Sequence, residues 1–236
     1  MPDRVYVFDL DDTLYLERDY VRSGFAHIGD IARDLYGVDG VGDHAWSLFE
    51  QGVRGNTFDL IVDRFALPAE ATRVFVEEYR DHPPAIALLA DAESYLRNLP
   101  DDAVGTGVIT DGYAAGQWRK LRALKLDEVL ENIVVTGDHG PEWTKPSENA
   151  FRLIESKFPL RGIEFVYFGD NPKKDFNAPR QLGWRTVRVR RPLGLHYAVD
   201  DAFDVDETIS TFPTTGATAR TPAGAPSSRE RGRLPQ

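Results

Sequence analysis

Carboxylate, hydroxyl and ammonium side chains recur in four short segments of this 236-residue chain. The segments are residues 9–13 (DLDDT), 110–112 (TDG), 145–147 (KPS) and 169–175 (GDNPKKD). Three of them directly follow a run of β-forming residues, and the KPS segment precedes a stretch suited to a helix. Because ligands of open α/β sheets bind beyond the carboxyl ends of the strands, we expect all four segments to meet at one sheet edge.

The acidic members of these segments predict a metal site. Together they would bring several negative charges close to one another, which is unfavourable unless a cation lies among them. They are Asp9, Asp11, Asp170 and Asp175. A donor set made of oxygen alone, without His or Cys, favours a hard ion. We therefore expect Mg²⁺ as the cofactor.

The remaining polar side chains suit a phosphate group. The hydroxyl of Thr110 and the ammonium of Lys145 are donors useful for an anion, and a neutralised phosphoryl group can be approached by an anionic nucleophile. An aspartate with an ordinary pKa of about 3.9 is ionised at pH 7 and can be that nucleophile. A second carboxylate two residues on, the spacing of Asp9 and Asp11, could serve as general acid and base. Its pKa must then be raised, which neighbouring carboxylates favour.

The rest of the pattern predicts an α/β domain. Five continuous β-forming runs are typical of parallel strands covered on both faces, and helix-like stretches follow the middle three. The runs are residues 5–8, 104–109, 133–135, 165–168 and 186–189. The stretches that follow are residues 114–124, 148–158 and 175–182. The fold class expected is a Rossmann-like, doubly wound parallel sheet.

Nearly 100 residues, with a sequence pattern typical of helices, separate the first two strands. A crossover connection needs only about a dozen residues. We expect helices at residues 20–36, 44–52, 57–65, 69–79 and 91–99. The excess predicts a helical cap at residues 15–84, inserted into an α/β core made of residues 1–14 and 85–212. Residues 213–236 are rich in Pro, Thr, Ala, Gly and Ser and basic in charge, and we expect this tail to be disordered.

Composition excludes several classes of protein. The chain has no cysteine, so disulfides, thiolate nucleophiles and cysteine-ligated metals are excluded. A formal net charge of −10 argues against nucleic acid as the main partner. We find no signal peptide and no apolar stretch long enough to span a membrane, and we expect a cytoplasmic protein. The five scattered histidines lack metal-ligand spacing and are expected on the surface or in the cap.

The four segments, in this order, resemble the motifs of the haloacid dehalogenase superfamily of aspartate-nucleophile phosphohydrolases. VYVFDLDDTLY resembles the first motif, VGTGVITDG the second, TKPSENAF the third and FVYFGDNPKKDFNAPRQLGWRTV the fourth. The resemblance covers roughly residues 4–190, and the combination of four motifs is far more specific than any one of them.

The resemblance implies a role for each acidic residue. Asp9 would be the nucleophile that forms an aspartyl-phosphate, and Asp11 the general acid and base, with its backbone carbonyl also reaching the magnesium. Asp170 would ligate the metal. Asp175 would be either a second ligand or the partner that orients Lys145.

The resemblance also implies how the substrate is held. Thr110 and Lys145 would bind the transferring phosphoryl group, with Asp111 and Gly112 in the same turn. In the expected cap, Arg54 lies between two glycines and could reach a phosphate or a sugar carboxylate. A solvated loop arginine explains the same pattern equally well.

The expected reaction is magnesium-dependent hydrolysis of a small phosphate monoester, which family resemblance suggests is a sugar phosphate or a nucleoside monophosphate. Three alternatives stay open. A dehalogenase would use Asp9 without magnesium, and a phosphomutase would return the phosphoryl group to a second position on the sugar. A non-enzymatic phospho-acceptor would keep a long-lived aspartyl-phosphate. The sequence leaves the oligomeric state unknown.

Overall fold

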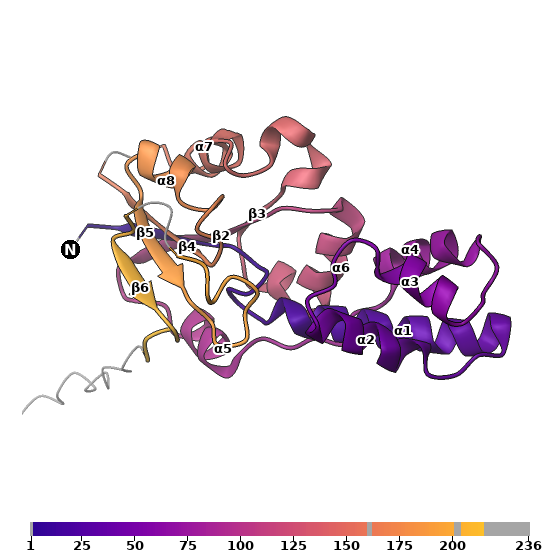
Figure 1. Cartoon of the computed structure of the whole chain (residues 1–236). Coiled ribbons are helices and arrows are strands. Elements are labelled where there is room, and N and C mark those ends of the chain that lie inside the picture. The colour runs from indigo at the N-terminus through magenta and orange to yellow at the C-terminus, as the bar shows by residue number, and fades with distance from the viewer. Residues whose placement is uncertain (1, 160–161, 201–203, 215–236) are drawn as a thin grey trace, which may run out of the picture.

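The computed structural model describes residues 2–159, 162–200 and 204–214, and its centre is a six-stranded, wholly parallel sheet (Figure 1). The order of the strands across the sheet is β3-β2-β1-β4-β5-β6. Their bounds are β1 (Arg4–Phe8), β2 (Ala103–Thr110), β3 (Asn132–Val135), β4 (Glu164–Gly169), β5 (Arg185–Val189) and β6 (Glu207–Ile209). The doubly wound α/β fold class predicted from the sequence is confirmed.

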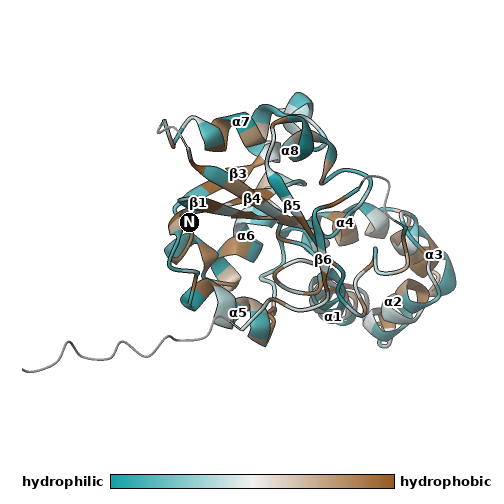
Figure 2. Ribbon diagram, turned by 90° about the vertical axis from the view of Figure 1, so that its left-hand side faces the viewer, coloured by the Kyte–Doolittle hydropathy of each residue, from teal (hydrophilic) through white to brown (hydrophobic). Residues whose placement is uncertain are grey.

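Side chains of the central strand β1 alternate between two apolar layers. Tyr6 and Phe8 belong to one buried cluster and Val5 and Val7 to the other, as expected where successive side chains point to opposite faces. The first layer includes α5 (Ala90–Arg97) and α6 (Ala114–Ala123), and the second α7 (Asn149–Glu155) and α8 (Asn177–Gln181). Figure 2 shows these two pairs of helices on opposite faces of the sheet.

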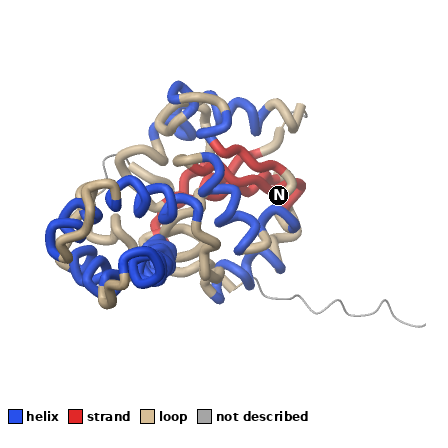
Figure 3. The backbone as a smooth tube through the Cα atoms, turned by 90° about the vertical axis from the view of Figure 1, so that its right-hand side faces the viewer, coloured by secondary structure: helices blue, strands red, loops and turns tan. Residues whose placement is uncertain are grey.

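Four further helices lie to one side of the sheet and form what we call the helical insertion (Figures 1 and 3). They are α1 (Glu17–Tyr36), α2 (Val41–Glu50), α3 (Thr57–Arg64) and α4 (Ala71–Asp81). Apolar residues from all four, among them Phe25, Ala45, Ile61 and Phe75, form a third buried cluster of their own. None of the helices that the structure describes is both long and apolar enough to cross a membrane.

Two local features differ from the sequence-based expectation. The short strand β6 was missed, because its three residues are charged, polar or only partly buried at the edge of the sheet. Helix α8 begins at Asn177 rather than at residue 175, and Pro179 therefore stands in the first turn, where no backbone N–H is needed. Of the tail expected to be disordered, residues 215–236 lie outside the described part of the chain.

Candidate active site

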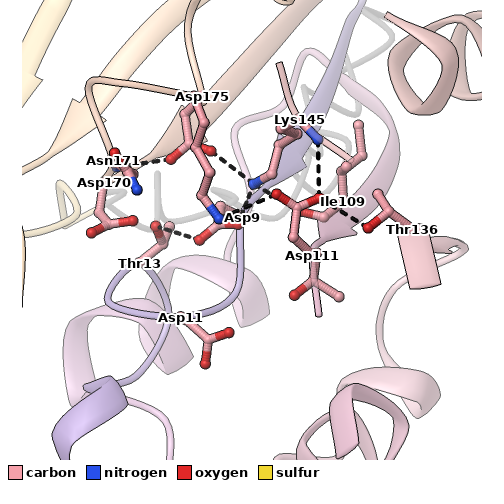
Figure 4. Close-up of polar contacts among 12 residues, drawn as sticks. Asp9, Asp11, Thr13, Ile109, Asp111, Thr136, Lys145, Asp170, Asn171 and Asp175 are labelled. Atoms are coloured by element: carbon pink, nitrogen blue, oxygen red, sulfur yellow. Dashed lines mark hydrogen bonds and ion pairs between the residues drawn. The ribbon is translucent and has the colours of Figure 1, made fainter. Parts of the chain in front are cut away.

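The four polar segments meet at the carboxyl edge of the sheet, and Lys145 is their centre (Figure 4). Its side chain is fully buried, and its Nζ lies 2.5 Å from Asp9 Oδ1 and 2.8 Å from Asp175 Oδ1. Nζ also lies 2.9 Å from the hydroxyl of Tyr167 on β4. Tyr167 was not identified from the sequence, where it reads as one more residue of a buried strand.

Asp9 is fixed by the end of β1 itself. Its backbone N–H donates to the carbonyl of Phe168 at 2.7 Å, which continues the pairing of β1 with β4. The next turn is closed by Asp12, which adopts a left-handed backbone with φ 55°. The two carboxylate oxygens of Asp12 accept the backbone N–H groups of Glu17 and Leu195, at 2.9 and 2.6 Å. Asp12 therefore ties this loop both to the start of α1 and to the loop after β5.

A buried arginine braces the same loop from the other side. The Nη2 of Arg191 donates to the carbonyl of Thr13 at 3.0 Å, and its Nη1 pairs with Asp91 at 2.5 Å. The hydroxyl of Thr13 in turn lies 3.4 Å from Asp9 Oδ2. The nucleophile expected from the sequence therefore stands on a loop with little freedom to move.

Three carboxylates lie close enough together that they could hold a cation. Oxygens of Asp9, Asp170 and Asp175 lie within 4.8 Å of one another, and all three residues are buried. Burial raises the pKa of Asp9 to about 8, with Asp175 and Asp170 adding to the rise and Lys145 opposing it. Burial and the charge of Asp175 likewise raise the pKa of Asp170. The ordinary aspartate pKa assumed from the sequence does not hold here, and a divalent cation among these oxygens would restore the ionised form.

The donor set fits magnesium in its chemistry, since it offers oxygen and no sulfur. Asp170 has one more neighbour, because His196 Nδ1 lies 2.8 Å from its Oδ2. The contact of His196 with Asp170 was not predicted from the sequence. His196 is half-buried on the loop after β5, and a sequence without repeated His spacing gave no signal for this contact.

Both oxygens of Asp175 are already engaged. Oδ1 accepts from Lys145, and Oδ2 accepts the backbone N–H of Asn171 at 2.8 Å. A Cβ at Gly169 would lie 2.7 Å from Asp175 Oδ2, so only glycine allows this approach. Of the two roles left open for Asp175, these contacts favour the orientation of Lys145.

The side chain of Asp11 points away from the carboxylate cluster, towards α6. It accepts from Lys120 Nζ at 2.7 Å, from Gln117 Nε2 at 2.9 Å and from the hydroxyl of Tyr15. Burial alone would raise the pKa of Asp11, but Lys120 and these donors lower it below the ordinary value. The raised pKa expected from neighbouring carboxylates is therefore wrong in this conformation. Gln117 and Lys120, three residues apart, share one face of α6.

The end of β2 supplies two further contacts. The Oγ1 of Thr110 is buried and lies 2.6 Å from Gln117 Nε2. Asp111 Oδ1 accepts the backbone N–H of Lys145 at 3.2 Å, while its Oδ2 pairs with Lys174 Nζ at 3.2 Å. Asp111, predicted to bind substrate, thus joins the loops after β2 and β4. Lys174 was missed because only folding brings it to this cluster.

Two other predicted substrate-binding residues are not part of the cluster. Gly112 adopts φ 134° and turns the chain into α6. Arg54 belongs to the helical insertion, where its Nη1 donates to the carbonyls of Phe49 and Val53 at 2.7 and 2.8 Å. Its guanidinium stands 3.8 Å from the centre of the Phe49 ring. Arg54 is not simply solvated, because it also forms part of the wall of a cavity between the insertion and the loop after β5. Its predicted role in substrate binding stays a prediction.

Comparison with known proteins identifies the family. A family model described as haloacid dehalogenase-like hydrolase matches residues 6–189. The chain is 26% identical over 215 residues to a glyceraldehyde 3-phosphate phosphatase of Methanocaldococcus jannaschii, covering 87% of this chain and 92% of that protein. It is 29% identical over 124 residues to a phosphoserine phosphatase of Thermus thermophilus, covering 52% of this chain and 47% of that protein.

Solved structures agree on the fold. A magnesium-bound structure of the hydrolase YfnB from Bacillus subtilis superposes with a TM-score of 0.62 at 18% identity, covering 89% of this chain and 96% of that one. At that identity the likeness concerns the fold alone. The match of the family model over most of the sequence decides the assignment: this chain belongs to the haloacid dehalogenase-like hydrolase family.

Proposed function

We propose that this chain hydrolyses a small phosphate monoester in a magnesium-dependent reaction, through an aspartyl-phosphate on Asp9. The observation that carries the proposal is the buried contact of Asp9 with Lys145 beside an oxygen-only cluster of carboxylates. The transfer of a phosphoryl group is stabilised when a buried ammonium group and a hard metal ion both contact the phosphoryl oxygens. The phosphatase names of the relatives support the same reaction class.

In the first step an oxygen of Asp9 attacks phosphorus, the bond from phosphorus to the ester oxygen breaks, and the departing oxygen takes a proton from Asp11. In the second step a water attacks phosphorus while Asp11 accepts a proton from that water. The bond from phosphorus to Asp9 then breaks, which releases phosphate and restores the nucleophile.

The other residues hold and orient. Lys145 and Thr110 bind phosphoryl oxygens, and Asp175 keeps Lys145 in place. Magnesium, held by Asp9, Asp170 and the backbone carbonyl of Asp11, would supply positive charge at the phosphoryl oxygens. Lys120 favours the ionised carboxylate of Asp11. We therefore expect Asp11 to leave Lys120 and take up a proton from water as substrate binds, and then to face the ester oxygen as the acid.

The helical insertion acts, in this proposal, as a cap that excludes water from the reaction. It joins the core beside the nucleophile, since α1 begins directly after the loop that carries Asp9 and Asp11. The relatives named for glyceraldehyde 3-phosphate and for phosphoserine place small phosphorylated metabolites first among the compounds to test.

The test is phosphate release from a panel of sugar phosphates, nucleoside monophosphates, phosphoserine and glyceraldehyde 3-phosphate, with magnesium and with a chelator. We expect turnover that needs magnesium and falls by at least about 10⁴-fold in Asp9→Asn, as for loss of an enzymatic nucleophile. Asp127→Asn, at an exposed position away from the site, is the matched control.

Each alternative has its own signature in this assay. Undiminished turnover in Asp9→Asn, or turnover that is indifferent to the chelator, contradicts the proposal. An isomeric sugar phosphate formed without free phosphate indicates a mutase, and halide release from a haloacid without magnesium indicates a dehalogenase. An aspartyl-phosphate that persists for hours without turnover indicates a phospho-acceptor.

A further inference from the structure

We infer, on the basis of the proposed function, that the alcohol released from the ester is apolar and carries an aromatic ring. The site for this group is a cavity of about 300 Å³ between the helical insertion and the loop after β5. Its size lies at the lower end of the range for small-molecule sites, which suits an alcohol with a single ring.

The position of the cavity places it on the leaving-group side of the reaction. Glu17 and Leu195 line it, and both donate a backbone N–H to Asp12, the neighbour of Asp11. In the proposed reaction Asp11 protonates the departing oxygen. A phosphoryl group resting against Asp9 and Lys145 would therefore direct its alcohol past Asp11 and into this cavity.

The walls of the cavity are mainly aromatic and aliphatic, since eight of its thirteen lining residues are apolar or aromatic. The Phe58 ring meets those of Phe25 and Tyr79 edge-on, with centroids 6.1 and 5.7 Å apart. Such walls offer faces and edges for a further ring to pack against. Leu195, at 36% exposure, adds an apolar side chain from the core.

Four of the thirteen lining residues have charged or polar side chains, namely Glu17, Arg54, Thr57 and Arg80, and Arg54 is already engaged. Arg54 Nη1 donates hydrogen bonds to two backbone carbonyls, and its guanidinium carbon lies 3.8 Å from the centre of the Phe49 ring, so this side chain extends the wall of the cavity. Hydroxyls of a polyol that lay against the apolar wall, away from Glu17, Thr57 and Arg80, would be buried without partners, which is unfavourable for each unpaired group. An apolar ring has no hydroxyl to leave unpaired, and its transfer from water into the cavity is favourable.

The test compares two alkyl phosphates whose leaving oxygens are similar, 3-phenylpropyl phosphate and glycerol 1-phosphate, in the presence of magnesium. We expect kcat/KM to favour the phenylpropyl ester by about tenfold or more, the scale on which a hydrophobic pocket discriminates. Leu195→Asn should lower this ratio severalfold, whereas Leu193→Asn should not. Leu193 is a matched control because it lies on the same loop, is 64% exposed and does not line the cavity.

A second pair of variants replaces valine by threonine, which has almost the same shape. Val76 on α4 lines the cavity and Val74 on the same helix does not, so Val76→Thr should lower the ratio and Val74→Thr should leave it unchanged. A ratio near one or in favour of the glycerol ester overturns the inference, as does an equal response of the paired variants.

Binding separates this inference from the proposed function. Calorimetry with 3-phenylpropylphosphonate, which cannot be hydrolysed, should show tighter binding to the wild type than to Leu195→Asn. If folded protein binds the phosphonate in this way but hydrolyses neither ester, the proposed function fails and the cavity assignment stands. If both esters are hydrolysed and the phosphonate binds equally to both proteins, the cavity assignment fails alone.

Discussion

The sheet edge and the helical insertion use charged side chains in opposite ways. At the edge, Lys145 and Asp175 are completely buried, and Lys145 forms ion pairs with both Asp175 and Asp9. In the insertion, the pair of Arg73 and Glu77 is exposed to 71% and 58%, and the interior is apolar. The core thus places charges where they can act on a phosphate, while the insertion offers shape and apolar surface. Chemistry and substrate choice are, in this account, assigned to different parts of the molecule.

The largest effect on stability and activity is expected for Lys145, the fully buried charge at the sheet edge. Lys145→Met leaves Asp9 and Asp175 buried without their counter-charge, and breaking a buried ion pair in this way typically costs about 3–5 kcal/mol. We expect a loss of that size in the free energy of unfolding at pH 7, measured by urea denaturation, together with loss of phosphate release. The exposed Lys173 provides the control variant Lys173→Met. An Lys145→Met protein as stable as the wild type would mean that the buried charges are not coupled.

An intermediate effect is expected at Asp91, whose carboxylate is partly buried. It accepts from Arg191 Nη1 at 2.5 Å, from the backbone N–H of Phe212 at 2.7 Å and from the hydroxyl of Thr211 at 2.9 Å. Burial would raise the pKa of Asp91, but Arg191 and the other donors lower it below the ordinary value. Asp91→Asn should lower the free energy of unfolding at pH 7 by about 1–3 kcal/mol.

The pH dependence of this effect has a definite sign. Because the folded protein lowers the pKa of Asp91, the stabilisation is complete above the unfolded pKa of about 3.9 and is lost as the pH falls through the lower, folded pKa. The difference in stability between wild type and Asp91→Asn should therefore shrink in strong acid. A difference that stays constant from pH 7 to below pH 3 would show that the charge of Asp91 contributes nothing.

The smallest effect is expected on the surface of the insertion. Arg73 Nη1 and Glu77 Oε1 are 2.8 Å apart on α4, but exposed pairs one turn apart on a helix contribute less than about 0.5 kcal/mol. Arg73→Ala should change the free energy of unfolding by no more than this and leave turnover intact. A loss well above 1 kcal/mol in the same urea titration would show that the insertion depends on its surface charges. The sheet edge and the insertion would then not differ in their use of charge.

Local sequence patterns predicted the strands of the sheet and the polar residues at their carboxyl ends. The five longer strands follow from their continuous apolar runs, and the residues at their carboxyl ends follow from the rule that parallel strands end at one edge. The contacts of Asp11 could not be predicted, because Gln117 and Lys120 lie more than 100 residues away and read as ordinary helix residues. The same holds for His196, whose contact with Asp170 depends on the path of a loop.

The covalent step on Asp9 is the central claim, and rapid acid quench during turnover tests it most directly. Wild-type protein, mixed with magnesium and its best substrate and quenched within milliseconds, would be digested and analysed by mass spectrometry. We predict one phosphoryl group on the peptide that contains Asp9, labile to hydroxylamine as an acyl phosphate should be, and none in Asp9→Asn. Steady phosphate release with no phosphoryl group on that peptide, or with the group on another residue, would contradict the account.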